Sequence, residues 1–131
     1  KRYEYHQHIL STRNRFQKTV CPILDWHKKA RKKLSPYELA TNFYCLSLSQ
    51  PQLFIEGNHR TENIVINYIL LNFDLPPFVV NMDNAKAYFN ISTKIKFTDK
   101  LSLIHNLTKI PDFQKKLRKV LEKFGDISYT K

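Results

Sequence analysis

The chain has 131 residues, of which 42% are hydrophobic and 13% aromatic, so it can bury one core and is not typical of a disordered or low-complexity segment. Lys and Arg number 22 against 11 Asp and Glu, and the resulting formal charge of +11 favours anionic partners such as nucleotides, nucleic acid, acidic proteins or a membrane surface. No apolar stretch is long enough to span a bilayer, and we expect no membrane partner. We expect a single domain over residues 1–131, cut from a longer protein because the chain begins at Lys1 without Met.

The cysteines and histidines argue against a metal centre. Cys21 and Cys45 are the only cysteines and form no CxxC pair, so neither a zinc knuckle nor a disulfide framework is indicated. We expect two reduced, buried thiols and a cytoplasmic protein or a delivered intracellular effector. Four histidines lack the paired spacing of metal ligands: His6, His8, His27 and His105.

Only two glycines occur, and together with few alternating apolar patterns this scarcity predicts an all-α domain punctuated by prolines. A first helix is expected over residues 5–19. A second begins near Pro22, which suits a first-turn position, and places Ile23, Trp26 and Ala30 at helical spacing. The basic residues between Lys28 and Lys33 are interpreted as a solvent-exposed face of this helix.

A third helix is predicted over residues 35–49. Ser35 with Glu38 three positions later is the pattern of a capping box, and Gln50-Pro51 ends the helix because Pro disfavours helical backbone in its predecessor. A loop over residues 52–59 would follow this buried helix.

The helix after the loop is expected to begin with Asn58 as its N-cap and to stop near Asp74, before Pro76-Pro77. It is apolar on nearly every side, which predicts a central helix surrounded by others. Its apolar residues are Ile64, Val65, Tyr68, Ile69 and Leu71.

The remaining segments predict a short extended piece over 78–80, short helices over 84–92 and 99–106, and a last helix over 112–124 that Gly125 terminates. In the last helix, the residues expected to face inward are Phe113, Leu117, Val120, Leu121 and Phe124. Those expected to face outward are Lys115, Lys116, Arg118, Lys119 and Lys123.

The loop has the chemistry of a phosphate site. Gly57 precedes a helix whose first N–H groups have no partner within the helix, and these can cradle phosphate oxygens. Glu56 can hold a divalent cation, and Arg60 can pair with a phosphate through two N–H groups. An ordinary turn with a structural Glu56–Arg60 ion pair is the alternative.

In these residues the sequence resembles the Fic family, whose motif is H-x-F-x-(D/E)-G-N-(G/K)-R-x-x-R followed by a hydrophobic helix in an all-α domain. The matching residues are Phe54, Glu56, Gly57, Asn58 and Arg60, within the segment Leu53-Phe54-Ile55-Glu56-Gly57-Asn58-His59-Arg60. A hydrophobic helix ending in Leu75-Pro76-Pro77-Phe78-Val79 follows, and a looser resemblance extends from Ser35 to Phe124.

The resemblance implies a protein adenylyltransferase ancestry, in which AMP is transferred from Mg²⁺-ATP to a hydroxyl of a target protein. By resemblance Phe54 is a core anchor of the loop and Glu56 is the Mg²⁺ ligand. Gly57 and Asn58 belong to the anion hole, and Arg60 contacts phosphate or braces the loop. The implied partners are therefore a nucleotide and a target protein.

Three positions depart from the motif. Gln52 stands where the family has its catalytic histidine, and because an amide is not a useful base, the loss of general-base help costs on the order of 10²–10⁴-fold in rate. Asn63 replaces the last arginine, which weakens phosphate recognition. His59 occupies a Gly or Lys position; it could touch a phosphate, but its backbone position points it away from Gln52. We therefore expect lost or altered catalysis.

Two regulatory features of the family lack their sequence signals. No hairpin turn that would form a target-docking flap is found between Tyr3 and Leu34, and no (S/T)-x-x-x-E-(G/N) inhibitory motif occurs. Two other readings stay open. In one, a basic helical module binds nucleic acid or an acidic protein through the Lys28–Lys33 and Lys115–Lys123 faces. In the other, the loop is a relic and the domain mediates only protein contacts.

Overall fold

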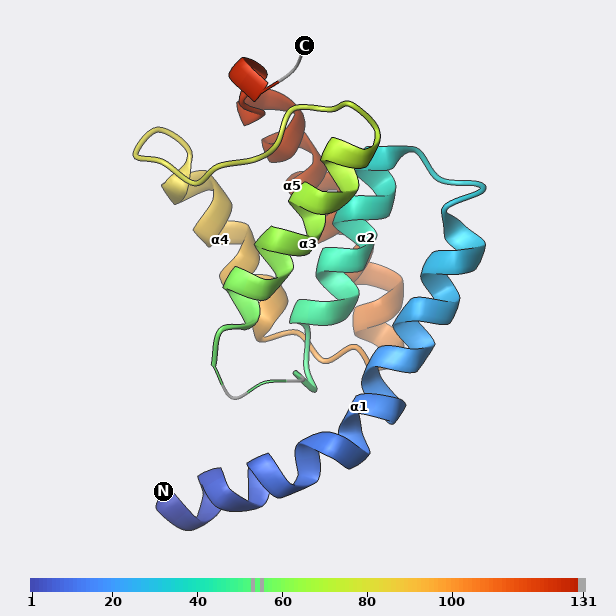
Figure 1. The fold of residues 1–131 in the computed structure, drawn as a ribbon, viewed down its shortest axis with the longest axis vertical. Coiled ribbons are helices and arrows are strands. Elements are labelled where there is room, and N and C mark those ends of the chain that lie inside the picture. Colours follow the sequence, from blue (N-terminus) through green and yellow to red (C-terminus); the bar gives the residue numbers. More distant parts are fainter. Residues whose placement is uncertain (53, 55, 130–131) are drawn as a thin grey trace.

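The computed structural model describes residues 1–52, 54 and 56–129, and within its first helix the side chains of residues 10, 12–17 and 19 are left out of the description. The described part of the chain is all-α, as predicted, and has no strand (Figure 1). Its helices are α1 (Arg2–Ala30), α2 (Pro36–Leu48), α3 (Asn58–Asn72), α4 (Ala85–Lys96), the π-helix η1 (His105–Lys109), α5 (Ile110–Phe124) and the 3-10 helix η2 (Ile127–Tyr129). None of these helices has the length and apolarity needed to cross a membrane.

The first 30 residues form one helix, so the prediction of two helices that meet at Pro22 is wrong. Pro22 lies inside α1, where it has no N–H to donate, and Figure 1 shows that α1 bends along its length. Trp26 and Ala30 hold its C-terminal half against the core, whereas Tyr3 and Tyr5 near its start are exposed. Cys21 is exposed as well, so only the burial predicted for Cys45 is confirmed.

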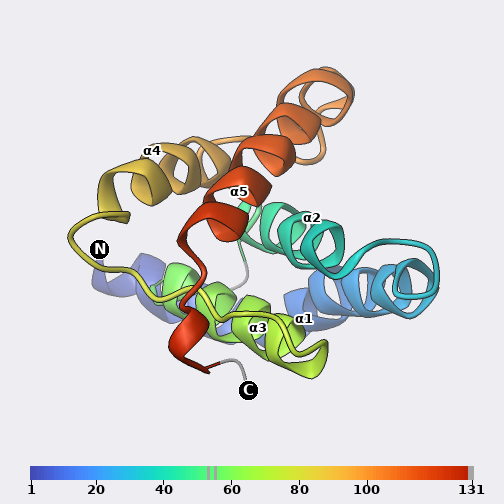
Figure 2. The ribbon, with the colours of Figure 1, turned by 90° about the horizontal axis from the view of Figure 1, so that it is seen from above.

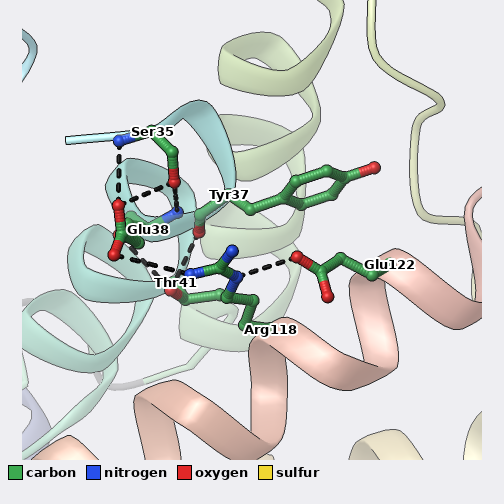
Figure 3. Close-up of polar contacts among 6 residues, drawn as sticks. All are labelled: Ser35, Tyr37, Glu38, Thr41, Arg118 and Glu122. Atoms are coloured by element: carbon green, nitrogen blue, oxygen red, sulfur yellow. Dashed lines mark hydrogen bonds and ion pairs between the residues drawn. The ribbon is translucent and has the colours of Figure 1, made fainter.

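α2 is the central helix of the fold. Leu39, Tyr44 and Leu48 are almost completely buried, and Figure 2 shows α1 and α3 on one side of α2, with α4 and α5 on the other. The capping box is confirmed: the Ser35 hydroxyl accepts from the N–H of Glu38, and the Glu38 carboxylate accepts from the N–H of Ser35 (Figure 3). Arg118 of α5 lies 3.4 Å from the same carboxylate and joins α5 to this end of α2.

α3 is not the surrounded helix that its composition predicts. Ile66 and Leu70 are buried, but Ile64, Tyr68 and Leu71 on the opposite face are exposed by 71%, 69% and 48%. A sequence that is apolar on every side shows no preferred face, and the central place is taken by α2, which contacts α1, α3, α4 and α5.

The connection from α3 to α4 is irregular but specifically bonded. The side chain of Asn67 donates to the carbonyl of Phe78 and accepts from its N–H, at 2.9 and 2.7 Å, so this one amide satisfies both backbone groups of a buried residue. No strand forms at 78–80. α4 then runs to Lys96, beyond the predicted end at residue 92, so Ser92 and Ile95 are buried within it.

The predicted helix over 99–106 is not a separate element. The chain makes a turn at residues 99–101 and then runs through η1 directly into α5, which starts at Ile110 rather than at Asp112. Gly125 ends α5, as predicted, and a Cβ atom at this position would lie 2.9 Å from the Cβ of Pro76. The inward face of α5 is confirmed at the core: Leu117, Val120 and Leu121 are buried, and Phe113 and Phe124 are partly buried against them.

Candidate functional site

The loop that follows α2 is tied to the far end of α4. The N–H of Gln50 donates to the carbonyl of Thr98, and the N–H of Lys100 donates to the carbonyl of Gln50, at 2.8 and 3.0 Å. These bonds form an isolated bridge between Gln50 and Asp99. The loop and the C-terminal end of α4 therefore lie at the same end of the molecule (Figure 1).

Gly57 makes the turn from the loop into α3. Its φ of +81° lies in the left-handed region, which glycine adopts without the penalty that a Cβ atom brings. No atom lies within 4 Å of where a Cβ would stand, so it is the backbone angle and not a lack of space that favours glycine here. Gly57 is also the N-cap of α3, which corrects the prediction that Asn58 holds that position.

Asn58 is the first residue of α3, and its buried side chain turns back to close the loop. Its amide donates to the carbonyl of Phe54 at 2.7 Å and to the side-chain oxygen of Gln52 at 3.3 Å, while its own oxygen accepts from the N–H of Phe54 at 3.2 Å. Asn58 can therefore offer a ligand its backbone N–H but not its amide. Phe54 is 40% exposed, so it does not anchor the loop in the core as expected; Leu53 and Ile55 lie outside the described residues.

Gln52, which the resemblance to the Fic motif aligns with a histidine, has a structural role in the loop. Its amide donates to the carbonyl of Leu48 at 2.7 Å, which satisfies an unpaired carbonyl at the C-terminus of α2. Its oxygen accepts from Asn58 at 3.3 Å. Both ends of the side chain are thus occupied, and Gln52 is not among the residues that line the cavity described next.

A cavity of about 300 Å³ lies at the N-terminus of α3, at the lower end of the range of ligand pockets. Its lining residues are Glu56, Gly57, Asn58, His59, Arg60 and Lys96. Five of them are consecutive in the chain, and the N–H groups of Asn58, His59 and Arg60 belong to the first turn of α3, where the helix dipole is positive. Lys96 comes from the last turn of α4, and no sequence signal connects it to the loop.

The charges around this cavity favour an anion. Arg60 and Lys96 carry two positive charges against the one negative charge of Glu56. Burial, followed by the nearby ammonium of Lys96, lowers the pKa of His59, so its imidazole is neutral at neutral pH. The ring of His59 lies 6.4 Å from that of Phe89 on α4, and its buried Nδ1 has no hydrogen-bond partner among the residues that the structure describes.

Glu56 is the single carboxylate of the cavity and is exposed. The hydroxyl of Tyr5, on α1, donates to its Oε1 at 3.4 Å, a contact that the sequence did not predict. Among the described residues no three His, Cys, Asp or Glu side chains gather as metal ligands. Glu56 alone fits the way proteins hold Mg²⁺, which keeps most of its waters and takes one or two carboxylates together with substrate phosphates.

Asn63 lies one turn beyond His59 on α3 but does not line the cavity, and its buried Oδ1 has no hydrogen-bond partner within the described part of the chain. Its neighbour Glu62 is also buried. Burial raises the pKa of Glu62 to about 8, against the opposing influence of the Ser47 hydroxyl and the Lys100 ammonium. Motif reasoning missed Glu62, because the position it occupies between Arg60 and Asn63 is variable in the pattern.

Comparisons of the chain with protein-family models, with curated proteins and with solved structures gave no significant match.

Proposed function

We propose that the cavity at the N-terminus of α3 binds a phosphate-bearing ligand, with a nucleotide as the favoured class. The observation that carries the proposal is that Arg60 and Lys96, from two different helices, line one cavity together with the first turn of α3, whose N–H groups have no partner within the helix. Phosphate oxygens suit this arrangement because guanidinium, ammonium and backbone N–H donors lie in the wall of the same cavity. The resemblance of the loop to the Fic motif supports the same ligand class.

Mg²⁺ with ATP is the ligand pair that the resemblance implies. Glu56 would hold the cation, Arg60 and Lys96 would contact phosphate oxygens, and the N–H groups of Gly57 to Arg60 would complete the anion hole. The cation would neutralise phosphate charge, so the carboxylate of Glu56 would not repel the ligand.

Transfer of AMP to a protein hydroxyl is the ancestral activity we infer, in a lost or altered form. Gln52 has no basic atom, and its bonds to Leu48 and Asn58 occupy its amide group. His59 contacts Phe89 of α4 rather than the end of α2 where Gln52 lies, and so is not positioned to take over as base. Binding of a nucleotide without efficient transfer is therefore the form of function we propose.

The test is thermal unfolding of the protein with and without Mg²⁺-ATP. A ligand that binds only the folded state raises Tm, and a concentration of a hundred times Kd stabilises by about 2.7 kcal/mol. We expect a rise for the unaltered protein and a smaller one for Arg60→Gln and Glu56→Gln. No rise at millimolar Mg²⁺-ATP, or an equal rise in both variants, would overturn the proposal.

A second candidate function is the binding of nucleic acid or an acidic protein by the basic end of α1. The residues Lys28, Lys29, Arg31, Lys32 and Lys33 are all exposed, and no ion pair is recorded for any of them among the described residues. The basic face of α5 differs, because Lys116 and Arg118 are paired with carboxylates. A steep loss of duplex binding with added salt would support this candidate.

A further inference from the structure

Five large apolar side chains are exposed within one short stretch of the chain, from Phe97 at the end of α4 to Leu107 in η1. Their exposed fractions are 70% or more: Phe97 72%, Leu101 77%, Leu103 72%, Ile104 71% and Leu107 70%. We call this set the apolar tip. Single exposed apolar residues are common on protein surfaces, whereas a concentration of large ones is a feature of interaction sites. In Figure 2 the orange segment that leads into α5 projects beyond the other helices.

The backbone of the apolar tip is held in place by hydrogen bonds. The N–H of Asp99 donates to Nδ1 of His105 at 3.3 Å, and the side chain of Asn106 donates to the carbonyl of Lys100. The ammonium of Lys100 donates to the carbonyl of Leu46 at 2.7 Å, which fastens the turn to α2. The exposed apolar side chains thus stand on a bonded turn, whose specific structure presents them outward.

The surroundings of the apolar tip are basic. Residues 94–111 contain four lysines and one carboxylate, that of Asp99, whose Oδ1 accepts from the N–H of Leu101. The ammonium of Lys100 is bonded to the carbonyl of Leu46, which leaves Lys94, Lys96 and Lys109 as the positive charges of this segment that can meet a partner. The Nζ of Lys96 lies 5.8 Å from the centre of the Phe97 ring, and that of Lys109 lies 3.1 Å from Nε2 of His105. A second copy of the chain would bring the same positive charges face to face, whereas an anionic surface would attract them.

We propose that the apolar tip inserts into the headgroup region of a membrane that contains anionic lipids. Leu, Ile and Phe beside Lys are the residues that peripheral proteins use at this interface, where apolar burial and attraction to anionic headgroups add together. The high exposure of these side chains fits a lipid surface, because each of them can enter the headgroup region without rearrangement of the core. Insertion of the apolar tip into the headgroup region requires only a few apolar side chains, so it needs no stretch of the sequence that spans the bilayer.

The test is co-sedimentation of the 131-residue protein with vesicles of phosphatidylcholine alone and of phosphatidylcholine mixed with phosphatidylserine. We expect binding to the mixed vesicles that weakens with added salt, and little binding to phosphatidylcholine alone. The triple variant Leu103→Ser, Ile104→Ser and Leu107→Ser should reduce the partition coefficient at least about tenfold, because three inserted side chains are lost. Its fold is expected to persist, since none of the three is buried.

A matched control is available on α3, where Ile64 and Tyr68 are equally exposed but lie outside the apolar tip. The double variant Ile64→Ser and Tyr68→Ser should bind the mixed vesicles as the unaltered protein does. Three results would overturn the proposal: no binding to mixed vesicles at low salt, equal binding by the triple variant, or self-association in sedimentation that the triple variant abolishes. The last result would assign the apolar tip to a contact between copies of the chain.

Discussion

The side-chain amide of Gln52 donates a hydrogen bond to the carbonyl oxygen of Leu48, 2.7 Å away, and so closes the C-terminus of α2. Gln52 thus stabilises the loop. A histidine at this position would change the hydrogen bonds of the loop as well as its chemistry.

For Gln52→His we expect a loss of stability of about 1–2 kcal/mol, because the bonds to Leu48 and Asn58 are removed or weakened. Urea unfolding measures this difference, and Gln7→His on the exposed face of α1 serves as the control. Radiolabelled ATP then tests whether the Gln52→His variant transfers AMP. An unchanged unfolding midpoint would contradict the role we assign to Gln52.

Replacement of Asn58 by Ala should cost about 2–3 kcal/mol, since the backbone groups of Phe54 lose their partners and a buried amide is removed. Asn90→Ala on α4 is the matched control, because Asn90 is exposed. Equal unfolding midpoints for the two variants would show that Asn58 does not brace the loop.

Lys96→Gln should lower the affinity for Mg²⁺-ATP, whereas Lys94→Gln, two residues away on the exposed side of α4, should not. The expected loss is about tenfold, the effect of removing one charge-assisted hydrogen bond of about 1.4 kcal/mol. Isothermal titration calorimetry gives both dissociation constants. A loss of equal size in both variants would mean that Lys96 acts only through the net charge of the protein.

The buried carboxyl of Glu62 predicts a pH dependence of stability. Its pKa rises from 4.5 to about 8 on folding, so the folded state holds a proton that the unfolded state releases. The contribution of Glu62 to the free energy of unfolding should therefore be greatest below pH 4.5 and should fall as the pH rises toward about 8. The groups that face Glu62 are Ser47, Tyr44, Tyr88 and Lys100.

Glu62→Gln removes this titration, and we expect it to stabilise the protein at neutral pH by on the order of 3 kcal/mol. The measurement is the unfolding free energy from pH 5 to 8.5, with the exposed Glu4→Gln as control. If the unfolding free energy of Glu62→Gln fell with pH as steeply as that of the unaltered protein, the pH dependence would belong to other groups.

The polar group drawn in Figure 3 allows a comparison of two kinds of contact. Ser35→Ala removes the N-cap of α2 and should cost about 1 kcal/mol, whereas Arg118→Gln should cost less. Arg118 reaches Glu38 and Glu122 from the surface, where water screens its ion pairs. Thermal unfolding of the two variants should rank them in this order, and the reverse order would show that the ion pairs dominate.

Local signals predicted the elements whose ends are set by side chains next to them in sequence. The capping box at Ser35, the end of α2 before Pro51 and the end of α5 at Gly125 are all found where the sequence placed them. The prediction of a helix start at Pro22 was wrong because proline occurs both in the first turn of a helix and at a bend inside one. Only the packing of Trp26 and Ala30 against the core decides between these two positions.

The candidate site was predictable in part, for a similar reason. Five lining residues of the cavity are neighbours in the sequence, and their pattern identified them. Lys96 and Tyr5 approach the loop only because α4 and α1 fold beside it, and no spacing in the sequence encodes that proximity. The sequence did not predict the apolar tip, because residue type alone does not distinguish an exposed leucine from a buried one.

Since the sixth wall residue of the cavity is supplied by α4, a synthetic fragment containing just the loop and α3 would lack a complete site. Adding α4 as a separate peptide would not restore it unless the intervening core also assembled. Ligand recognition is in this sense a property of the assembled tertiary structure, and the occupancy of the cavity would report whether the whole chain has folded.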